Sequence, residues 1–114
     1  MTEHPVLRFS RDWSKLNERM FTTIRKPHPP YDAPEGTIFQ VETPTRTFLA
    51  SLAFSTETEL EELSTDLLTY DTDSDTRERA LGVLNSFYRT APVTVQLMLL
   101  IRLGADQPRE VSLK

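Results

Sequence analysis

The side chains best suited to hold a ligand lie close together in residues 22–31. Arg25 carries a planar guanidinium, which can bind a phosphate or a carboxylate through two parallel hydrogen bonds. Thr23 precedes it by two residues, so in an extended strand both side chains share one face, and the hydroxyl can bind a base or a sugar. Lys26 adds positive charge, and Tyr31 offers a ring on which a base can stack. These residue types are suited to holding a phosphate or a carboxylate beside a base.

These residues also have structural interpretations, which the sequence leaves open. Arg25 can form a salt bridge with Asp32 or Glu35. Thr23 suits a strand simply because it is β-branched. Tyr31 can pack against the prolines that surround it.

Two other groups of polar residues resemble metal ligands only superficially. Asp71, Asp73 and Asp75 alternate as in a calcium loop, but the glycine and the distal glutamate of such a loop are missing. Capping at the start of the following helix is the plainer explanation of these aspartates. His4 and His28 lie far apart and have no partners at metal-ligand spacing. We therefore expect no metal and no cofactor.

Composition sets the broad class of the protein. The 114 residues, 38% of them apolar, predict one domain over residues 1–114, with a core from about residue 6 to 103 and a flexible tail over 104–114. The absence of cysteine excludes thiolate catalysis and cysteine-bound zinc. No apolar run approaches the roughly 20 residues of a membrane helix, and the N-terminus does not resemble a signal peptide. The sequence predicts a cytoplasmic protein without membrane contact.

Hydrophobic periodicity predicts an α+β fold. Expected strands cover residues 6–9, 21–25, 37–42, 47–54 and 93–103, and expected helices cover residues 11–19, 56–68 and 75–88. The proline-rich segment 26–36 is expected to be a loop. Trp13, Leu16 and Met20 form the apolar stripe of the first helix, which directs Lys15 mostly toward solvent.

The fourth expected strand and the second expected helix carry further specific predictions. Strand 47–54 alternates cleanly, with Phe48, Ala50, Leu52 and Phe54 on one face. Thr56 followed by Glu59 resembles a capping box at the start of helix 56–68.

The order of these elements resembles the ASCH domains, a branch of the PUA-like superfamily. The match rests on Phe9 with Trp13 and Leu16, on the Thr-x-Arg element in 22–25, and on the turn and strand 35–41. The resemblance implies a small open β-barrel of about five to six strands with two to three flanking helices. It also implies a cleft beside the Thr-x-Arg strand that handles RNA or nucleosides.

Some small members of this family hydrolyse the amide of 4-acetylcytidine with a lysine, a threonine and an acidic residue. The resemblance assigns the threonine to Thr23 and the acid to Asp73, with Asp71 or Asp75 as alternatives. Met20 occupies the position of the lysine, and a thioether cannot transfer a proton.

Three functions follow from these observations. The first is an RNA- or nucleotide-binding ASCH-like domain that uses Arg25, Thr23, Lys26 and Tyr31. The second is a small amidohydrolase that acts on a modified nucleoside, with Thr23 and Asp73 as catalytic residues and with Lys26 or water in place of the missing lysine. The third is a protein-interaction module that uses the acidic residues 57–78. The acidic run 57–75 is expected to repel nucleic acid, so any RNA must approach the opposite side, which is expected to carry the cations of residues 8–26. We expect a monomer.

Overall fold

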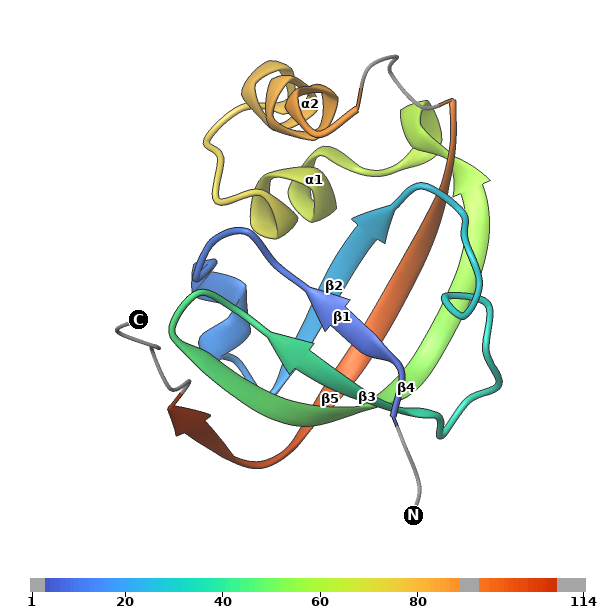
Figure 1. Cartoon of the computed structure of the whole chain (residues 1–114). Coiled ribbons are helices and arrows are strands. Elements are labelled where there is room, and N and C mark those ends of the chain that lie inside the picture. Colours follow the sequence, from blue (N-terminus) through green and yellow to red (C-terminus); the bar gives the residue numbers. More distant parts are fainter. Residues whose placement is uncertain (1–3, 89–92, 109–114) are drawn as a thin grey trace.

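A mixed five-stranded β-sheet forms the framework of the chain (Figure 1). The computed structural model describes residues 4–88 and 93–108. The strands are β1 (Val6–Arg8), β2 (Met20–Arg25), β3 (Ile38–Glu42), β4 (Arg46–Glu59) and β5 (Thr94–Pro108). Their order in the sheet is β1-β3-β4-β5-β2; β1 and β3 run parallel, and the other neighbours are antiparallel. The predicted α+β class is confirmed.

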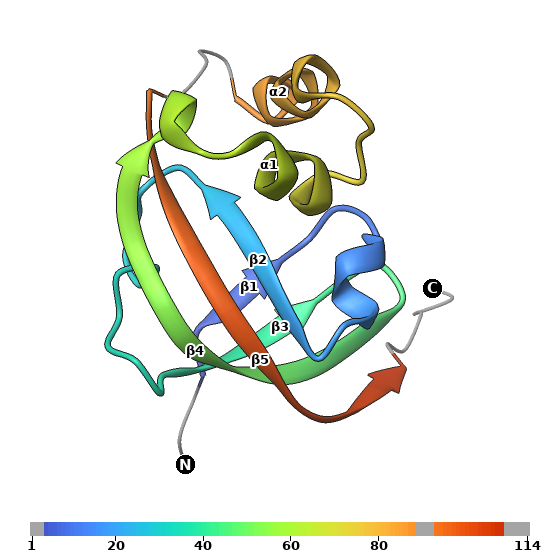
Figure 2. The same ribbon diagram turned by 180° about the vertical axis from the view of Figure 1, so that it is seen from behind.

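Four short helical segments accompany the sheet. Two are 3₁₀ turns, η1 (Ser14–Asn17) and η2 (Leu60–Glu62), and two are α-helices, α1 (Thr65–Asp71) and α2 (Arg77–Ser86). Figures 1 and 2 show α1 and α2 together at one end of the curved sheet, with η1 beside β1 and β2. None of the helices in the described residues is long and apolar enough to cross a membrane.

Two apolar clusters hold these layers together. The larger cluster lies within the curve of the sheet and contains Phe9, Trp13, Leu16, Phe21 and Phe48 among its buried residues. The smaller one joins the sheet to the helices and contains the buried residues Ile24, Leu60, Leu63, Leu68, Ala80, Leu84 and Val95. The two faces of β2 therefore serve different clusters, since Phe21 belongs to the first and Ile24 to the second.

The predicted helix over residues 11–19 is wrong. Only the 3₁₀ turn η1 forms there, after Trp13 in an extended conformation. Trp13 and Leu16 are buried as predicted, and their spacing of three residues matches one turn of a 3₁₀-helix. Met20, however, begins β2 opposite Ile101 and is 47% exposed. A helix this short is marginal in water, so tertiary packing decides its form.

The predicted helix over residues 56–68 begins nine residues late, at Thr65. Thr56 and Glu59 belong to β4 and pair with Leu97 and Thr94 of β5. The cap of α1 is Ser64, whose side chain accepts a hydrogen bond from the amide of Leu67. The apparent capping box is therefore a strand segment, because pairing with β5 satisfies its backbone groups.

The alternation predicted for residues 47–54 holds only as far as Leu52. Phe48, Ala50 and Leu52 are buried, but Phe54 is 45% exposed. Leu52 pairs with Leu100 while Phe54 pairs with Leu99, so β4 contains an extra residue at this point. Such a bulge reverses the faces of the side chains that follow it.

The last strand is longer than predicted. β5 continues through Gly104, which has a φ of +80°, and pairs with β4 as far as Pro108. Glycine adopts this left-handed conformation without steric cost, so the strand can bend and pair again. The predicted tail therefore begins as a strand, and its residues 109–114 lie outside the described residues.

Candidate functional site

A pocket of about 250 Å³ lies where η1, β1 and β2 meet the two helices. Aromatic side chains line part of it, namely Phe9, Trp13, Phe87 and Tyr88. The aliphatic side chains of Ile24 and Leu84 also line it. Polar and charged side chains line the rest, namely Arg8, Ser10, Lys15, Thr23, Arg25, Asp71 and Thr72. The pocket thus combines flat apolar walls with a few convergent polar groups, which is typical of a small-molecule site.

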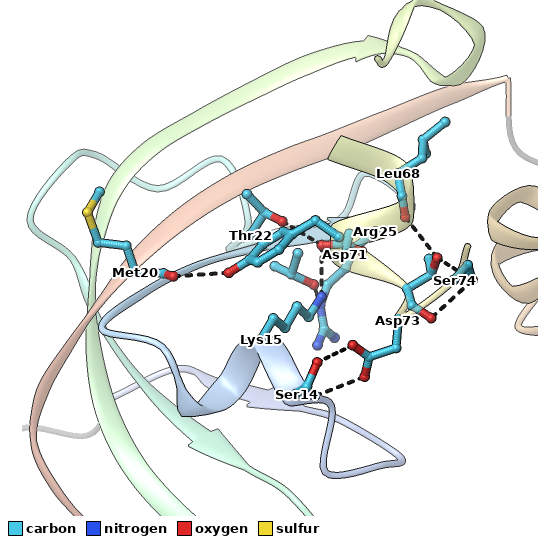
Figure 3. Close-up of polar contacts among 12 residues, drawn as sticks. Ser14, Lys15, Met20, Thr22, Arg25, Leu68, Asp71, Asp73 and Ser74 are labelled. Atoms are coloured by element: carbon cyan, nitrogen blue, oxygen red, sulfur yellow. Dashed lines mark hydrogen bonds and ion pairs between the residues drawn. The ribbon is translucent and has the colours of Figure 1, made fainter. Parts of the chain in front are cut away.

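The polar centre of the pocket is an ion pair between Lys15 and Asp71 (Figure 3). The Lys15 ammonium donates to Asp71 Oδ1 over 2.8 Å, and the hydroxyl of Thr22 donates to the same oxygen over 2.7 Å. The side chains of Lys15 and Asp71 are only 3% and 4% exposed. Three separate elements, η1, α1 and β2, thus converge on one carboxylate.

The surroundings of Lys15 alter its acidity. Its ammonium lies 5.3 Å from the ring centre of Phe9 and 5.9 Å from that of Trp13. Burial in this apolar setting lowers the pKa of Lys15 below its usual value, because the desolvation cost outweighs the attraction of Asp71. A lysine with a lowered pKa gives up its proton more readily and is suited to acid–base chemistry.

Arg25 lies at the gap between the two edge strands of the sheet. Its Nη2 donates to the backbone carbonyl of Arg8 on β1 over 2.8 Å, and its Nε donates to Thr23 Oγ1 over 3.0 Å. Its Nη1 makes a longer contact of 3.5 Å with the hydroxyl of Tyr31. The guanidinium also lies over the ring of Phe9 at 4.7 Å. The shared strand face predicted for Thr23 and Arg25 agrees with the hydrogen bond between them.

Every partner of Arg25 in these contacts is uncharged. Within residues 4–88 and 93–108, Arg25 forms no ion pair with a carboxylate. The alternative of a salt bridge to Asp32 or Glu35 is therefore not what the structure contains, and both of those residues are exposed. Among the described residues, Arg25 is thus a half-buried cation at the pocket without an acidic partner.

The three alternating aspartates have separate environments. Asp71, which the sequence offers only as an alternative, is the one that lines the pocket. Asp73 is exposed and accepts hydrogen bonds from the backbone amide of Ser14, over 2.9 Å, and from its hydroxyl. Asp75 pairs with Arg79 on the surface of α2. Asp73 thus fastens the α1–α2 connection to η1, next to the lysine that reaches Asp71.

The other residues predicted to bind a ligand lie at the margin of the site. Lys26 is exposed and its side chain does not line the pocket; its backbone amide donates to the hydroxyl of Tyr88 over 3.0 Å. Tyr31 is half-buried, packs against the main core and contacts Arg25. Met20 lies at the opposite end of β2 from Arg25, where its carbonyl accepts from the hydroxyl of Tyr70.

Sequence reasoning misses Lys15, the central cation of the pocket. The expected helix directs it to solvent, and lysine is almost never fully buried without a partner. Its partner Asp71 lies 56 residues away, so no local pattern reveals the pair.

Comparisons of the chain with protein-family models, with curated proteins and with solved structures found no significant match. In the described part of the chain, no group of three or more histidine, aspartate and glutamate side chains could hold a metal ion. The chemistry available to this site lies in four kinds of side chain: a lysine of lowered pKa, a buried carboxylate, threonine hydroxyls and an arginine.

Proposed function

We propose that this chain is an ASCH-like domain, an open PUA-like barrel, whose pocket binds a modified nucleoside and hydrolyses an exocyclic amide on its base. One observation carries the proposal, the buried Lys15–Asp71 pair in an aromatic pocket. Burying two charges costs several kcal/mol per ion, so such pairs in pockets are candidates for function. Lys15 supplies, from η1, the lysine that the family pattern places at the position of Met20.

The pocket suits a base with its sugar. Its volume of about 250 Å³ is below the roughly 300–1,000 Å³ usual for drug-sized ligands, so it accommodates one small molecule. The rings of Phe9, Trp13 and Phe87 offer flat apolar surfaces to a base. Thr23 and Arg25 add hydrogen-bonding groups to the same wall.

Amide hydrolysis needs a base for the attacking water and an acid for the leaving nitrogen. In our proposal the Asp71 carboxylate accepts a proton from the water as its oxygen attacks the acyl carbon. The Lys15 ammonium stabilises the oxyanion that forms and then donates a proton to the departing amine. Asp71 passes its proton back to Lys15, which restores both side chains. The products are the free amino base and a carboxylic acid, which ionises by releasing its proton to the solvent. The lowered pKa of Lys15 favours the donating step.

The direct test is incubation of the protein with 4-acetylcytidine, with cytidine and acetate measured by chromatography. We expect product from the wild type and a loss of roughly 10²–10⁴-fold in Asp71→Asn, which keeps the shape of the side chain but removes the base. Lys15→Arg keeps the positive charge but cannot release a proton near neutral pH, so it should lose activity similarly.

Arg79→Gln is the matched control, because Arg79 is exposed on α2 and, among the described residues, its guanidinium pairs only with Asp75, just before that helix. It should leave turnover unchanged. Wild-type protein that binds the nucleoside but forms no product would refute hydrolysis. That result would support the second candidate, a binding domain without chemistry, which is favoured by the commitment of Asp71 Oδ1 to two internal donors.

A further inference from the structure

The pocket carries an excess of positive charge that the proposed hydrolysis does not use. Its lining contains three cations, Arg8, Lys15 and Arg25, and a single carboxylate, Asp71. Lys15 and Asp71 neutralise each other and Arg8 contacts Glu42, so Arg25 is the lining cation that has no acidic partner among the described residues. This excess occurs in a chain whose formal net charge is −4. A local reversal of sign of this kind concentrates anions at the site.

Arg25 is the cation of the pocket that is best placed to bind an anion. It is half-buried, lies against the rings of Phe9 and Tyr31, and hydrogen-bonds only to uncharged groups. Buried charges in proteins are normally paired with an opposite charge. Arginine has five N–H groups and the described contacts use three, so two remain for a bidentate partner.

Arg8 and Ser10 extend the positive wall outward. The side chain of Arg8 is 80% exposed, and only its Nε contacts Glu42, over 3.3 Å. The Glu42 side chain is only 16% exposed, but the Arg8 side chain lies mostly in solvent, which screens this single contact and leaves the Nη groups open to a ligand. Ser10 is exposed beside Arg8 and also lines the pocket, which adds a hydroxyl donor.

We propose that the pocket takes a nucleoside monophosphate, with the base between the aromatic walls and the phosphate bound by Arg25 and Arg8. The position of the base in this assignment rests on the proposed function. The new element is the phosphate, which lets the protein prefer a nucleotide to a nucleoside. The pocket holds one small ligand, and the acidic residues 57–78 repel a polyanion, so a free nucleotide is favoured over an RNA strand.

The test is a binding titration with cytidine, cytidine 5′-monophosphate, inorganic phosphate and a short single-stranded RNA, followed by NMR shifts of the backbone amides. A charge-assisted contact is worth about 1.5–3 kcal/mol, so we expect the monophosphate to bind roughly ten- to a hundredfold tighter than cytidine. The shifts specific to the phosphate should include Arg8, Ser10 and Arg25. Phosphate alone should compete with the monophosphate and not with cytidine.

Two variants assign the effect to the arginines. Arg25→Gln should reduce the affinity for the monophosphate to that for cytidine. Arg8→Gln, at an exposed position that leaves the fold intact, should remove part of the preference and weaken its dependence on salt. Arg79→Gln, on α2 and outside the pocket, should change neither affinity.

The outcomes separate this inference from the proposed hydrolysis. Equal affinity for cytidine and its monophosphate would overturn the phosphate site even if 4-acetylcytidine is hydrolysed. Tighter binding of the RNA than of the monophosphate would overturn the choice of a free nucleotide. Preference for the monophosphate without any amide hydrolysis would support the phosphate site and refute only the chemistry.

Discussion

At the scale of single residues, the energetics of the Lys15–Asp71 pair can be tested without a ligand. Removing one partner leaves the other charge buried and uncompensated, so Lys15→Met should destabilise the protein by about 3–5 kcal/mol. The double variant Lys15→Met with Asp71→Leu should recover much of this loss, because it buries no charge. Urea unfolding of the four members of the cycle measures the coupling.

The exposed pair of Arg79 and Asp75 provides the matched control. Arg79→Met should change the stability by no more than about 0.5 kcal/mol, since surface pairs contribute little. A single Lys15→Met variant as stable as the wild type would contradict the burial of this pair.

The lowered pKa of Lys15 predicts how the stability depends on pH. The unfolded chain has the ordinary lysine pKa of 10.5, so between the folded and unfolded values the unfolded state binds more protons. The free energy of unfolding should therefore rise with pH in that window, while the cost of the charged lysine is present in full below it. Lys15→Met should lack this rise when urea midpoints are compared over the alkaline range.

Tyr70 should make the free energy of unfolding change with pH in the opposite direction, so its contribution must be separated from that of Lys15. Desolvation raises its pKa above the ordinary 10.0, so above that pH the unfolded state loses its proton first and stability falls. Tyr70→Phe removes this contribution. A Tyr70→Phe protein whose stability is flat over the alkaline range would show that the pKa of Lys15 is not lowered.

At the scale of elements, the contact between Asp73 and Ser14 sets the distance between η1 and α1. Asp73 has a φ of +52°, a conformation that asparagine and glycine tolerate better than alanine. Asp73→Ala should cost about 1–3 kcal/mol, because it loses the hydrogen bonds to Ser14 and keeps the unfavourable backbone. Asp73→Asn, which can still accept from the Ser14 amide, should retain most of the stability.

Amide hydrogen exchange distinguishes this role from a catalytic role of Asp73. Loss of the contact should speed exchange in η1 and in the last turn of α1, which hold Lys15 and Asp71. If Asp73→Ala abolishes hydrolysis while exchange in both elements stays unchanged, Asp73 acts in the chemistry instead, as the family pattern implies.

At the scale of the whole molecule, the outer face of the sheet bears on association. Leu49, Phe54 and Leu103 are between 37% and 45% exposed there, but polar residues such as Ser51 interrupt them. We expect a monomer of 13.1 kDa, because these apolar side chains are only partly exposed and Ser51 lies between Leu49 and Phe54 on β4. Sedimentation equilibrium over a range of concentrations checks the mass. A dimer that Leu103→Ser dissolves would identify this face as an interface instead.

The sequence by itself determined the α+β class, most of the five strands and the common face of Thr23 and Arg25. These features follow from local alternation and β-propensity, which act over a few residues. It also marked Trp13 and Leu16 as core residues, because their apolar character demands burial in any conformation. The shared face was predictable because successive side chains of a strand alternate whatever the rest of the fold does.

Only the tertiary structure decided the polar centre of the pocket. Lys15 is buried because Phe9, Trp13 and Asp71 pack around its ammonium, and Asp71 comes from a distant part of the chain. The end of β4, the bulge before Phe54 and the late start of α1 likewise depend on pairing with β5. Long-range pairing and desolvation outweigh local propensity at these points. Neither effect can be recognised from the pattern of neighbouring residues alone.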